Sequence, residues 1–465
     1  MICFSFKNSV LSKEFHRQLS ATLTALMVVF SYGISLGWIT PLLYILQSND
    51  SPLTFKISIE DTSWIGSLSN AGGLIGTVFF GYLIDRAGRK ICLYILPLPH
   101  IAFWIIVYFS KNAYHLYLAR FVGGITGGGI FLIFPIFISE IADPKIRGTL
   151  GSLIPLLTNV GVLVGYIVGS HVPYYIVPPV VIVLPAVSLL FMIYYPETPQ
   201  HLLRKGHYDQ AKRSLEYYTN FKKKNTNDES KFDTHFMDLK TAIEVTNQQQ
   251  KVTFNDFCNK RAITAMATGI TIIFINVFCG YFSITNYSTL IFAETKSSID
   301  PNTSTIVIGV VMILGSYFAS YFVDKFGRRI LMMLSSGSMA LGLSAIGTHA
   351  YLTNWIDLTK FPLLPVVIIS FIIFAGSTGI AAINSVLIVE VLPPKIRSWG
   401  TTICQIILGI FSFGALKIFP ILMANIGLWG VMWIFASVAS FGFFFFLFCL
   451  QETKGKSLDD DNAFN

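Results

Sequence analysis

The chain has 465 residues, of which 53% are hydrophobic and only 12% are charged, and its mean hydropathy is +0.62. Soluble domains carry about twice that share of charged residues, so this chain has too few polar side chains to cover several water-exposed surfaces. The composition therefore excludes a soluble multidomain protein and indicates a polytopic membrane protein. The formal net charge of +8 also raises the question of nucleic-acid binding, which the positions of the basic residues answer below.

Apolar segments near the ~20-residue length that crosses a bilayer recur along the whole chain and predict twelve spans. Each must be helical, because hydrocarbon offers no hydrogen-bond partner to a free backbone amide and the alternation of a barrel strand is absent. The predicted spans are residues 20–46, 63–84, 91–110, 115–140, 149–170, 174–195, 261–293, 304–323, 330–350, 362–389, 398–424 and 428–450.

The loops between these spans alternate in charge. Most of the 33 Lys and Arg residues lie in loops on the side of the two termini, whereas the opposite loops contain only isolated lysines. The positive-inside rule therefore predicts that both termini and the long middle loop are cytoplasmic, and it explains the positive charge without nucleic acid. Two glycosylation sequons, at Asn49 and Asn302, fall in the predicted outer loops and favour the plasma membrane.

Three charged landmarks of the first half of the chain recur in the second half in the same order. The pairs are Asp85 to Lys90 with Asp324 to Arg329, Glu140 and Arg147 with Glu390 and Arg397, and Glu197-Thr198 with Glu452-Thr453. Each landmark follows the second, fourth or sixth span of its half, which predicts an all-α membrane protein made of two parallel six-helix halves. We expect a cytoplasmic N-terminus at 1–19, an N-terminal half at 20–195, a linker with short amphipathic helices at 196–260, a C-terminal half at 261–450 and a cytoplasmic C-terminus at 451–465.

These landmarks and several other residues resemble the signatures of the sugar porter family of the major facilitator superfamily, over nearly the whole chain. The matching residues are Gly81, Asp85 to Lys90, Arg120, Glu140, Arg147-Gly148, Pro196 to Pro199, Asp324 to Arg329, Glu390, Arg397 and Glu452 to Leu458. A closer resemblance is to the insect facilitated trehalose transporter-like branch, carried by Gly37-Trp38, Pro41, Arg147 to Gly151, Asn159, Gly161, Leu392 to Arg397, Lys417 and Phe419-Pro420. The resemblance implies the major facilitator fold and a transporter that moves a sugar of the trehalose or hexose class by alternating access.

Carboxylates and guanidinium groups at the cytoplasmic helix ends can pair between neighbouring helices at low solvent exposure. The resemblance implies that they form the network that closes the cytoplasmic side when the cavity faces outward. Its residues are Asp85, Arg86, Arg89, Glu140, Arg147, Asp324, Arg328, Glu390 and Arg397. The alternative is that these charges serve only as positive-inside anchors.

A sugar site needs amide and hydroxyl side chains beside aromatic rings, in a cavity near the middle of the bilayer. The candidates for hydrogen bonding are Thr158, Asn159, Asn276, Ser283, Asn384 and Gln405. The candidates for stacking or gating are Trp38, Phe282 and Tyr287. For each of these residues, a contact between helices is the alternative to a contact with substrate.

Some candidates depart from the family pattern. Asn276-Val277 stands where the family has two glutamines, Phe282 stands at an asparagine, and the segment 381–385 replaces the family's Gly-Pro-x-Pro-Trp. These departures leave a sugar, a polyol and an unrelated small solute open as substrates.

Two basic residues, Arg120 and Lys417, lie inside predicted spans, where a charge must face protein or water. We expect Arg120 to pair near Glu140, at the end of its own helix, or with a loop. For Lys417, extension toward the membrane surface is the alternative to a functional role.

The positions of the acidic residues bear on whether transport is coupled to protons. Ser35 occupies the place at which the family's proton symporters carry an aspartate, and no Asp lies in the middle of a predicted span. Facilitated diffusion is therefore the predicted mechanism, and a proton-coupled symporter and a transport-inactive sensor of the same fold are the alternatives. We expect no enzymatic activity, cofactor or metal, because Gly33-x-Ser35-x-Gly37 lies inside a span rather than after a strand and the cysteines have no paired spacing.

Overall fold

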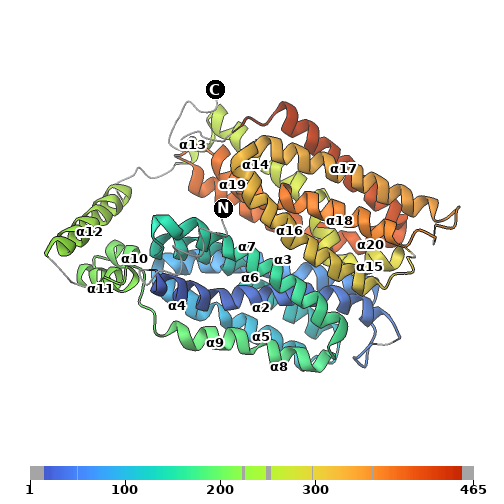
Figure 1. The fold of residues 1–465 in the computed structure, drawn as a ribbon, viewed down its shortest axis with the longest axis horizontal. Helices are drawn as coiled ribbons and strands as arrows, with labels where there is room; N and C mark the ends of the chain where they lie inside the picture. The colour runs from blue at the N-terminus through green and yellow to red at the C-terminus, as the bar shows by residue number, and fades with distance from the viewer. Residues whose placement is uncertain are drawn as a thin grey trace.

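The computed structural model describes residues 15–49, 51–221, 226–247, 253–295, 297–358 and 360–452. Within these ranges the regular secondary structure is helical and no strand occurs, which confirms the predicted all-α class. Figure 1 shows two helical bundles, one drawn in blue to green and the other in yellow to red. Residues 1–14, 453–465 and the basic segment 222–224 lie outside the described ranges.

The first bundle is formed by the N-terminal part of the chain. Its elements are α2 (His16–Gln47), α3 (Ile59–Ala87), α4 (Arg89–Ile95), α5 (Pro97–Tyr108), α6 (Ala113–Ile141), α7 (Pro144–His171), η1 (Tyr174–Ile176), α8 (Val177–Val181) and α9 (Val183–Met192). The third and sixth predicted spans are each built from consecutive shorter pieces. Proline at the first position of α5 explains one of these joints, because it has no N–H to donate to the preceding turn.

The second bundle is formed by the C-terminal part. Its helices are α14 (Lys260–Phe278), α15 (Tyr281–Glu294), α16 (Pro301–Phe326), α17 (Arg328–Leu352), α18 (Leu363–Thr378), α19 (Ile380–Val391) and α20 (Arg397–Phe448). With 52 residues, α20 is too long for one crossing of a hydrocarbon core of about 30 Å. Its backbone turns at Gly427, where φ is +72°, so α20 contains the last two predicted spans.

Four further helices join the bundles: α10 (Pro199–Arg204), α11 (Tyr208–Tyr218), α12 (Thr226–Asn247) and α13 (Phe254–Phe257). They lie beyond one end of the bundles, which we call the linker end; the opposite end is the far end (Figure 1). The linker is fixed to α2, because the side-chain amide of Gln18 donates to the carbonyl oxygen of Tyr218 at 3.1 Å. The hydroxyl of Tyr218 donates in turn to the carbonyl oxygen of Pro196 at 2.8 Å.

The seventh and tenth spans are each broken near their middle, which corrects the expectation of continuous helices. Gly280, with φ of +91°, separates α14 from α15, and Gly379 separates α18 from α19. At the second break, the Ser335 hydroxyl donates to the carbonyl oxygen of Ala375 at 2.6 Å and accepts from the amide of Ile380 at 3.1 Å. Backbone groups freed by a break inside a membrane need such partners, and broken helices of this kind surround the substrate sites of transporters.

Candidate functional site

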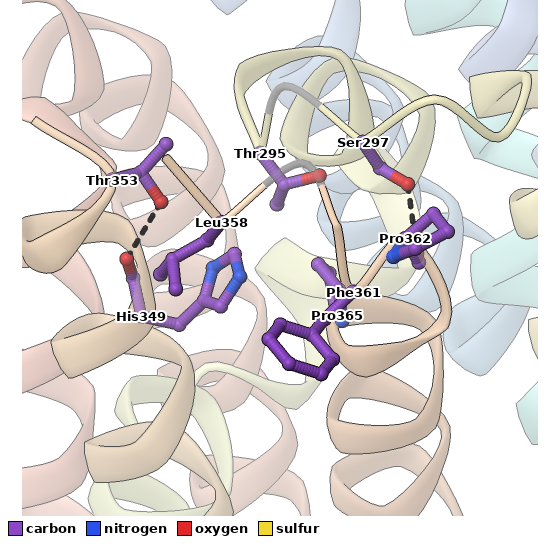
Figure 2. Close-up of a pocket in the computed structure, with 8 residues that line it drawn as sticks. All are labelled: Thr295, Ser297, His349, Thr353, Leu358, Phe361, Pro362 and Pro365. Carbon is purple, nitrogen blue, oxygen red and sulfur yellow. Dashed lines mark hydrogen bonds between the residues drawn. The ribbon is translucent and has the colours of Figure 1, made fainter. Parts of the chain in front are cut away.

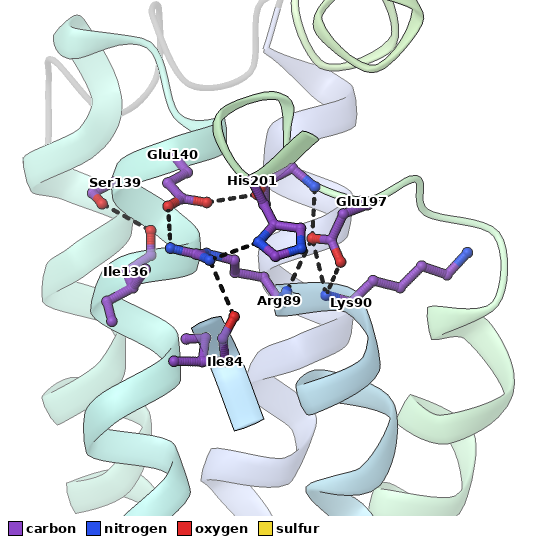
Figure 3. A network of polar contacts seen from close by, with 9 residues as sticks. Ile84, Arg89, Lys90, Ile136, Ser139, Glu140, Glu197 and His201 are labelled. Carbon is purple, nitrogen blue, oxygen red and sulfur yellow. Dashed lines mark hydrogen bonds and ion pairs between the residues drawn. The ribbon is translucent and has the colours of Figure 1, made fainter. Parts of the chain in front are cut away.

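A buried ion pair connects Arg89 and Glu140 at the linker end of the first bundle. The two side chains are 2.8 Å apart and each is only 3% exposed. Figure 3 shows the Arg89 guanidinium between Glu140 and His201. The Arg89 guanidinium also donates to the carbonyl oxygen of Ile84 at 3.1 Å. Glu140 accepts a hydrogen bond from the Thr198 hydroxyl at 2.5 Å. The pair therefore ties α4 and α6 to the start of the linker.

A second carboxylate, Glu197, accepts hydrogen bonds from the first backbone amides of α4. Its distances to the amides of Arg89 and Lys90 are 3.0 and 3.1 Å (Figure 3). A carboxylate at a helix N-terminus satisfies free N–H groups and stabilises the positive end of the helix dipole. Gly88 is required there, because its φ is +94° and a Cβ atom on it would lie 2.2 Å from the carboxylate of Glu197.

The second bundle repeats this arrangement at the same end. Arg328 pairs with Glu390 at 3.2 Å, and Glu452 accepts hydrogen bonds from the backbone amides of Arg328 and Arg329 at 2.9 and 3.1 Å. Gly327 has φ of +86°, and a Cβ atom on it would lie 2.5 Å from Glu452. Glu197 and Glu452 are landmarks of the sequence repeat, but the repeat did not predict their role as helix caps. Each of the two ion pairs joins residues of one bundle.

The other predicted network residues are more accessible. Asp85 and Arg86 are exposed, and so is Arg147. Arg147 and the half-buried Arg397 each donate to the backbone carbonyl five residues earlier, at 3.3 Å. The side chain of Asp324 lies outside the described part of the structure. The structure thus brings together Arg89 with Glu140 and Arg328 with Glu390.

His201 was not predicted, and the only signal for it was its position four residues after Glu197. Its Nδ1 lies 3.0 Å from the Arg89 guanidinium, which can only donate, so Nδ1 is the acceptor. Burial and the nearby charge of Arg89 lower the pKa of His201 from 6.5 to about 4. The imidazole is therefore neutral in the folded protein at neutral pH.

This histidine gives a pH prediction. Between pH 6.5 and about 4 the unfolded chain binds a proton that the folded chain does not bind, so acidification across this window lowers the stability. We expect the thermal unfolding temperature to fall less between pH 7.5 and about 4.5 in His201→Gln than in the unsubstituted protein. The control is His207→Gln, which changes an exposed histidine and should keep the full pH dependence. Equal pH dependence in all three proteins would contradict the prediction.

The two bundles contact each other at the far end through the broken helix α15. The Tyr166 hydroxyl of α7 donates to the carbonyl oxygen of Thr285 at 2.8 Å. The Thr40 hydroxyl of α2 donates to the carbonyl oxygen of Asn286 at 3.0 Å. Closer to the middle, the Asn159 side chain donates to the Ser316 hydroxyl at 2.8 Å, also between the bundles. Asn159 therefore makes the helix contact that was its alternative role.

Tyr287 fills the space between the bundles at the far end. It is fully buried, its hydroxyl donates to the carbonyl oxygen of Leu416 at 2.9 Å, and its ring stacks on Phe419 at 5.1 Å. The first bundle faces it with Gly66, on which a Cβ atom would lie 1.9 Å from the Tyr287 hydroxyl oxygen. Tyr287 therefore packs at the contact between the two bundles, where it touches α20 of its own half and faces α3 of the other.

At the linker end, some residues at the helix starts of both bundles lack close neighbours. A Cβ atom on Gly148 or Gly151, at the start of α7, would meet no atom within 4 Å. Trp399, at the start of α20, is 61% exposed. The described contacts thus hold the two bundles together at the far end and in the middle, and leave the first turns of α7 uncovered.

Two predicted amides lie near the breaks of α14/α15 and α18/α19. The Asn276 side chain donates to the carbonyl oxygen of Ile380 at 2.8 Å, and Asn384 lies one helical turn after Ile380. Both side chains are buried, and the Oδ1 atom of each has no hydrogen-bond partner. Ser283 is also buried with an unpaired hydroxyl. Unpaired buried acceptors are costly, which makes them suitable for a solute that donates hydroxyl groups.

The remaining candidates lie elsewhere. Trp38 is buried in the first bundle, with its ring 5.5 Å from Trp104, so the structure places it in helix packing. Thr158 donates to the carbonyl oxygen of its own helix at 2.9 Å. Phe282 and Gln405 are half-buried.

Arg120 is 3% exposed and has no carboxylate partner among the described residues. It donates to the carbonyl oxygens of Ile65 and Ser35, at 3.0 and 3.4 Å, and to the Ser69 hydroxyl at 3.0 Å. The expected pairing near Glu140 or with a loop was wrong. The guanidinium reaches across to α2 and α3, where backbone dipoles replace an acid.

A small cavity lies at the far end of the second bundle, between the ends of α15 and α17 and the start of α18 (Figure 2). The space inside it that a water-sized sphere can occupy is only about 10 Å³, and Thr295, His349 and Phe361 are among the residues that line it. Pockets that enclose small organic ligands are larger, about 300 Å³ or more. We therefore do not place the substrate there.

Known proteins resemble this chain over almost its full length. The family model described as "Sugar (and other) transporter" matches residues 18–463. Facilitated trehalose transporters of Bombyx mori and Apis mellifera ligustica are 29% and 27% identical to it. Each alignment covers 95% of this chain, with 86% and 87% of the respective relative.

Solved structures agree on the fold. The inward-open xylose transporter XylE of E. coli superimposes with a TM-score of 0.75 at 20% identity, covering 95% of this chain and 98% of that chain. The proton:xylose symporter XylE bound to a bromodeoxyglucose gives 0.72 at 20% identity, covering 96% and 98%. With a family match over nearly the whole chain and the major facilitator fold, this integral membrane protein belongs to the sugar (and other) transporter family.

Proposed function

We propose that the protein carries a sugar of the trehalose or hexose class across the membrane by facilitated diffusion with alternating access. The observation that carries the proposal is the distribution of contacts between the bundles. Tyr166 and Thr40 bind α15 at the far end, whereas Arg89–Glu140 and Arg328–Glu390 close within single bundles at the linker end. Such an arrangement allows the two halves to part at one end while they stay closed at the other.

The linker end is proposed to face the cytoplasm, because the basic loops gather there, and the protein is proposed to reside in the plasma membrane. The structure described above is then the inward-facing form. In the outward-facing form, Arg147 and Arg397 would approach acidic groups of the opposite half and complete the network. Asn49 is exposed, which suits a glycosylation site, whereas Asn302 lies half-buried in the first turn of α16.

Among the described residues Arg120 contacts no acid, and this supports facilitated diffusion. Proton-coupled carriers commonly use a carboxylate, or a histidine, that gains and loses a proton inside the membrane. Here the carbonyl oxygen of Ser35 takes the place of that acid as the partner of Arg120. A proton cannot be carried by this contact.

Substrate contact is proposed at the breaks of the seventh and tenth spans. The unpaired amide oxygens of Asn276 and Asn384 would accept hydrogen bonds from sugar hydroxyls, as would the hydroxyl of Ser283. Phe282 and Gln405 are half-buried and could contact the same solute. Named trehalose transporters among the relatives make trehalose the first sugar to test.

Uptake into proteoliposomes tests this proposal. We expect saturable entry of radiolabelled trehalose or glucose that is unchanged by a protonophore, with Asn384→Leu lowering the rate and the exposed-residue control Lys111→Met leaving it unchanged. Uptake that a proton gradient drives would support the symporter instead. Sugar binding without flux would support the transport-inactive sensor.

A further inference from the structure

Lys417 is a cation in the far-end part of α20, ten residues before the turn at Gly427. It is half-buried in a stretch that is otherwise apolar. The sequence left open whether it extends toward the membrane surface or has a function. In the structure, the hydrogen bond of the Lys417 side chain and its contact with an aromatic ring are both with residues of the other bundle.

The Lys417 ammonium group meets two residues of α3. Its Nζ donates to the Ser63 hydroxyl oxygen at 2.7 Å, and it lies 3.7 Å from the centroid of the Trp64 ring. Because α20 belongs to the second bundle and α3 to the first, both contacts cross between the two halves. An ammonium group over the face of tryptophan is held by the negative face of the ring, more strongly where water is excluded.

The surface that receives Lys417 is suited to a cation beyond these two contacts. Asp61 lies one turn before Trp64, and the Tyr117 hydroxyl donates to its carboxylate. The Trp64 ring also packs near Tyr117, at 6.5 Å, and near Phe413 of the second bundle, at 6.3 Å. The first bundle thus presents an acidic and aromatic surface, and the second supplies the charge that fits it.

We infer that Lys417 fastens the far end of the carrier in its closed position and so sets the balance between the two facing states. The contacts exist only while the far end is closed, because opening that end separates α3 from α20. Opening therefore requires Lys417 to leave the Trp64 ring and the Ser63 hydroxyl and to be hydrated. This inference rests on the proposed alternating access and assigns to Lys417 a positioning role, without contact to the substrate.

Distances between spin labels at the far end test the inference. The labels are placed on Lys56→Cys and Asn354→Cys, two exposed positions on opposite halves, in the full chain with its six native cysteines replaced by alanine and reconstituted in liposomes. We expect Lys417→Met to raise the ratio of far-end-open to far-end-closed molecules about tenfold, which lies between the effects of an exposed and a desolvated cation–π contact. Lys417→Arg, which keeps a charge that stacks on tryptophan, should stay close to the parent.

Two further variants separate the contact from general damage. Lys111→Met removes an exposed lysine just before the start of α6, and it should leave the distances between the labels unchanged. Trp64→Leu should shift the ratio in the same direction as Lys417→Met, and the double variant should shift it no further, because the two side chains act through one contact. Unchanged distances in Lys417→Met, or equal shifts in Lys111→Met, would overturn the inference.

Failure of this inference can be told from failure of the proposed function. The label distances are measured without sugar, so they report on Lys417 even if no sugar is transported. If the far end never opens in any variant, alternating access itself is refuted. If it opens equally in the parent and in Lys417→Met, only the role of Lys417 is refuted.

Discussion

Glu140→Ala is expected to be among the most destabilising single substitutions in this protein. It leaves the Arg89 guanidinium, 3% exposed, without the carboxylate that lies 2.8 Å away. Breaking a buried ion pair by removing one partner costs about 3–5 kcal/mol, because the remaining charge stays buried. We expect a large fall in the thermal unfolding temperature of the purified protein in detergent, together with loss of sugar uptake.

The matched control is the equivalent substitution in the second bundle, Glu390→Ala. Its partner Arg328 is 3.2 Å away, and the two side chains are 18% and 15% exposed, so water can replace part of the lost contact. The fall in unfolding temperature should be smaller. Arg86→Ala, at an exposed position, should have little effect. A fall for Glu390→Ala as large as that for Glu140→Ala would show that burial does not set the cost.

Gly66→Ala is expected to slow transport about tenfold or more with the protein still folded. The new methyl group would lie 1.9 Å from the hydroxyl oxygen of Tyr287, which is held by Leu416 and stacked on Phe419. Overpacking of this kind costs about 1–3 kcal/mol, and here the cost falls on the far-end-closed state alone. Initial rates of uptake and equilibrium sugar binding, measured on the same preparations, check this: uptake should fall while binding remains.

The control for this prediction lies on the same helix. Gly73→Ala adds a methyl group 3.6 Å from the nearest carbonyl oxygen, an ordinary contact within the first bundle. It should transport at the parental rate. If Gly66→Ala transports normally, Tyr287 moves aside at little cost and does not act as a gate. If both variants lose binding and flux together, the effect of Gly66→Ala is on folding.

The ion-pair network shows how far sequence patterns reach. The repeat placed Arg89 with Glu140 and Arg328 with Glu390 at matching helix ends, and the structure joins each pair. Spacing alone did not predict His201, because nothing in a sequence says which ring nitrogen will face a guanidinium in a buried space. The helix-capping role of Glu197 was missed for a related reason: its partners are backbone amides, which every sequence contains.

For the candidate binding residues, side-chain chemistry alone could not distinguish substrate contact from helix packing. Side-chain chemistry selected Trp38 and Asn159 for substrate contact, but packing places Trp38 among aromatic rings of one bundle and Asn159 against Ser316 of the other. Amide and aromatic groups serve helix packing as well as they serve sugars. Only neighbouring atoms can distinguish these uses.

The sequence by itself determined the number of spans, their helical nature, the two repeated halves and the family. These follow from the requirement that a chain in hydrocarbon bury its amides in helices and keep its charges at the ends, a constraint that acts on each segment separately. Only the tertiary structure decided where α14/α15 and α18/α19 break, where hydrogen bonds join the two bundles, and that Lys417 rests on Trp64. Those features depend on contacts between segments hundreds of residues apart, whose free energy is a property of both surfaces together.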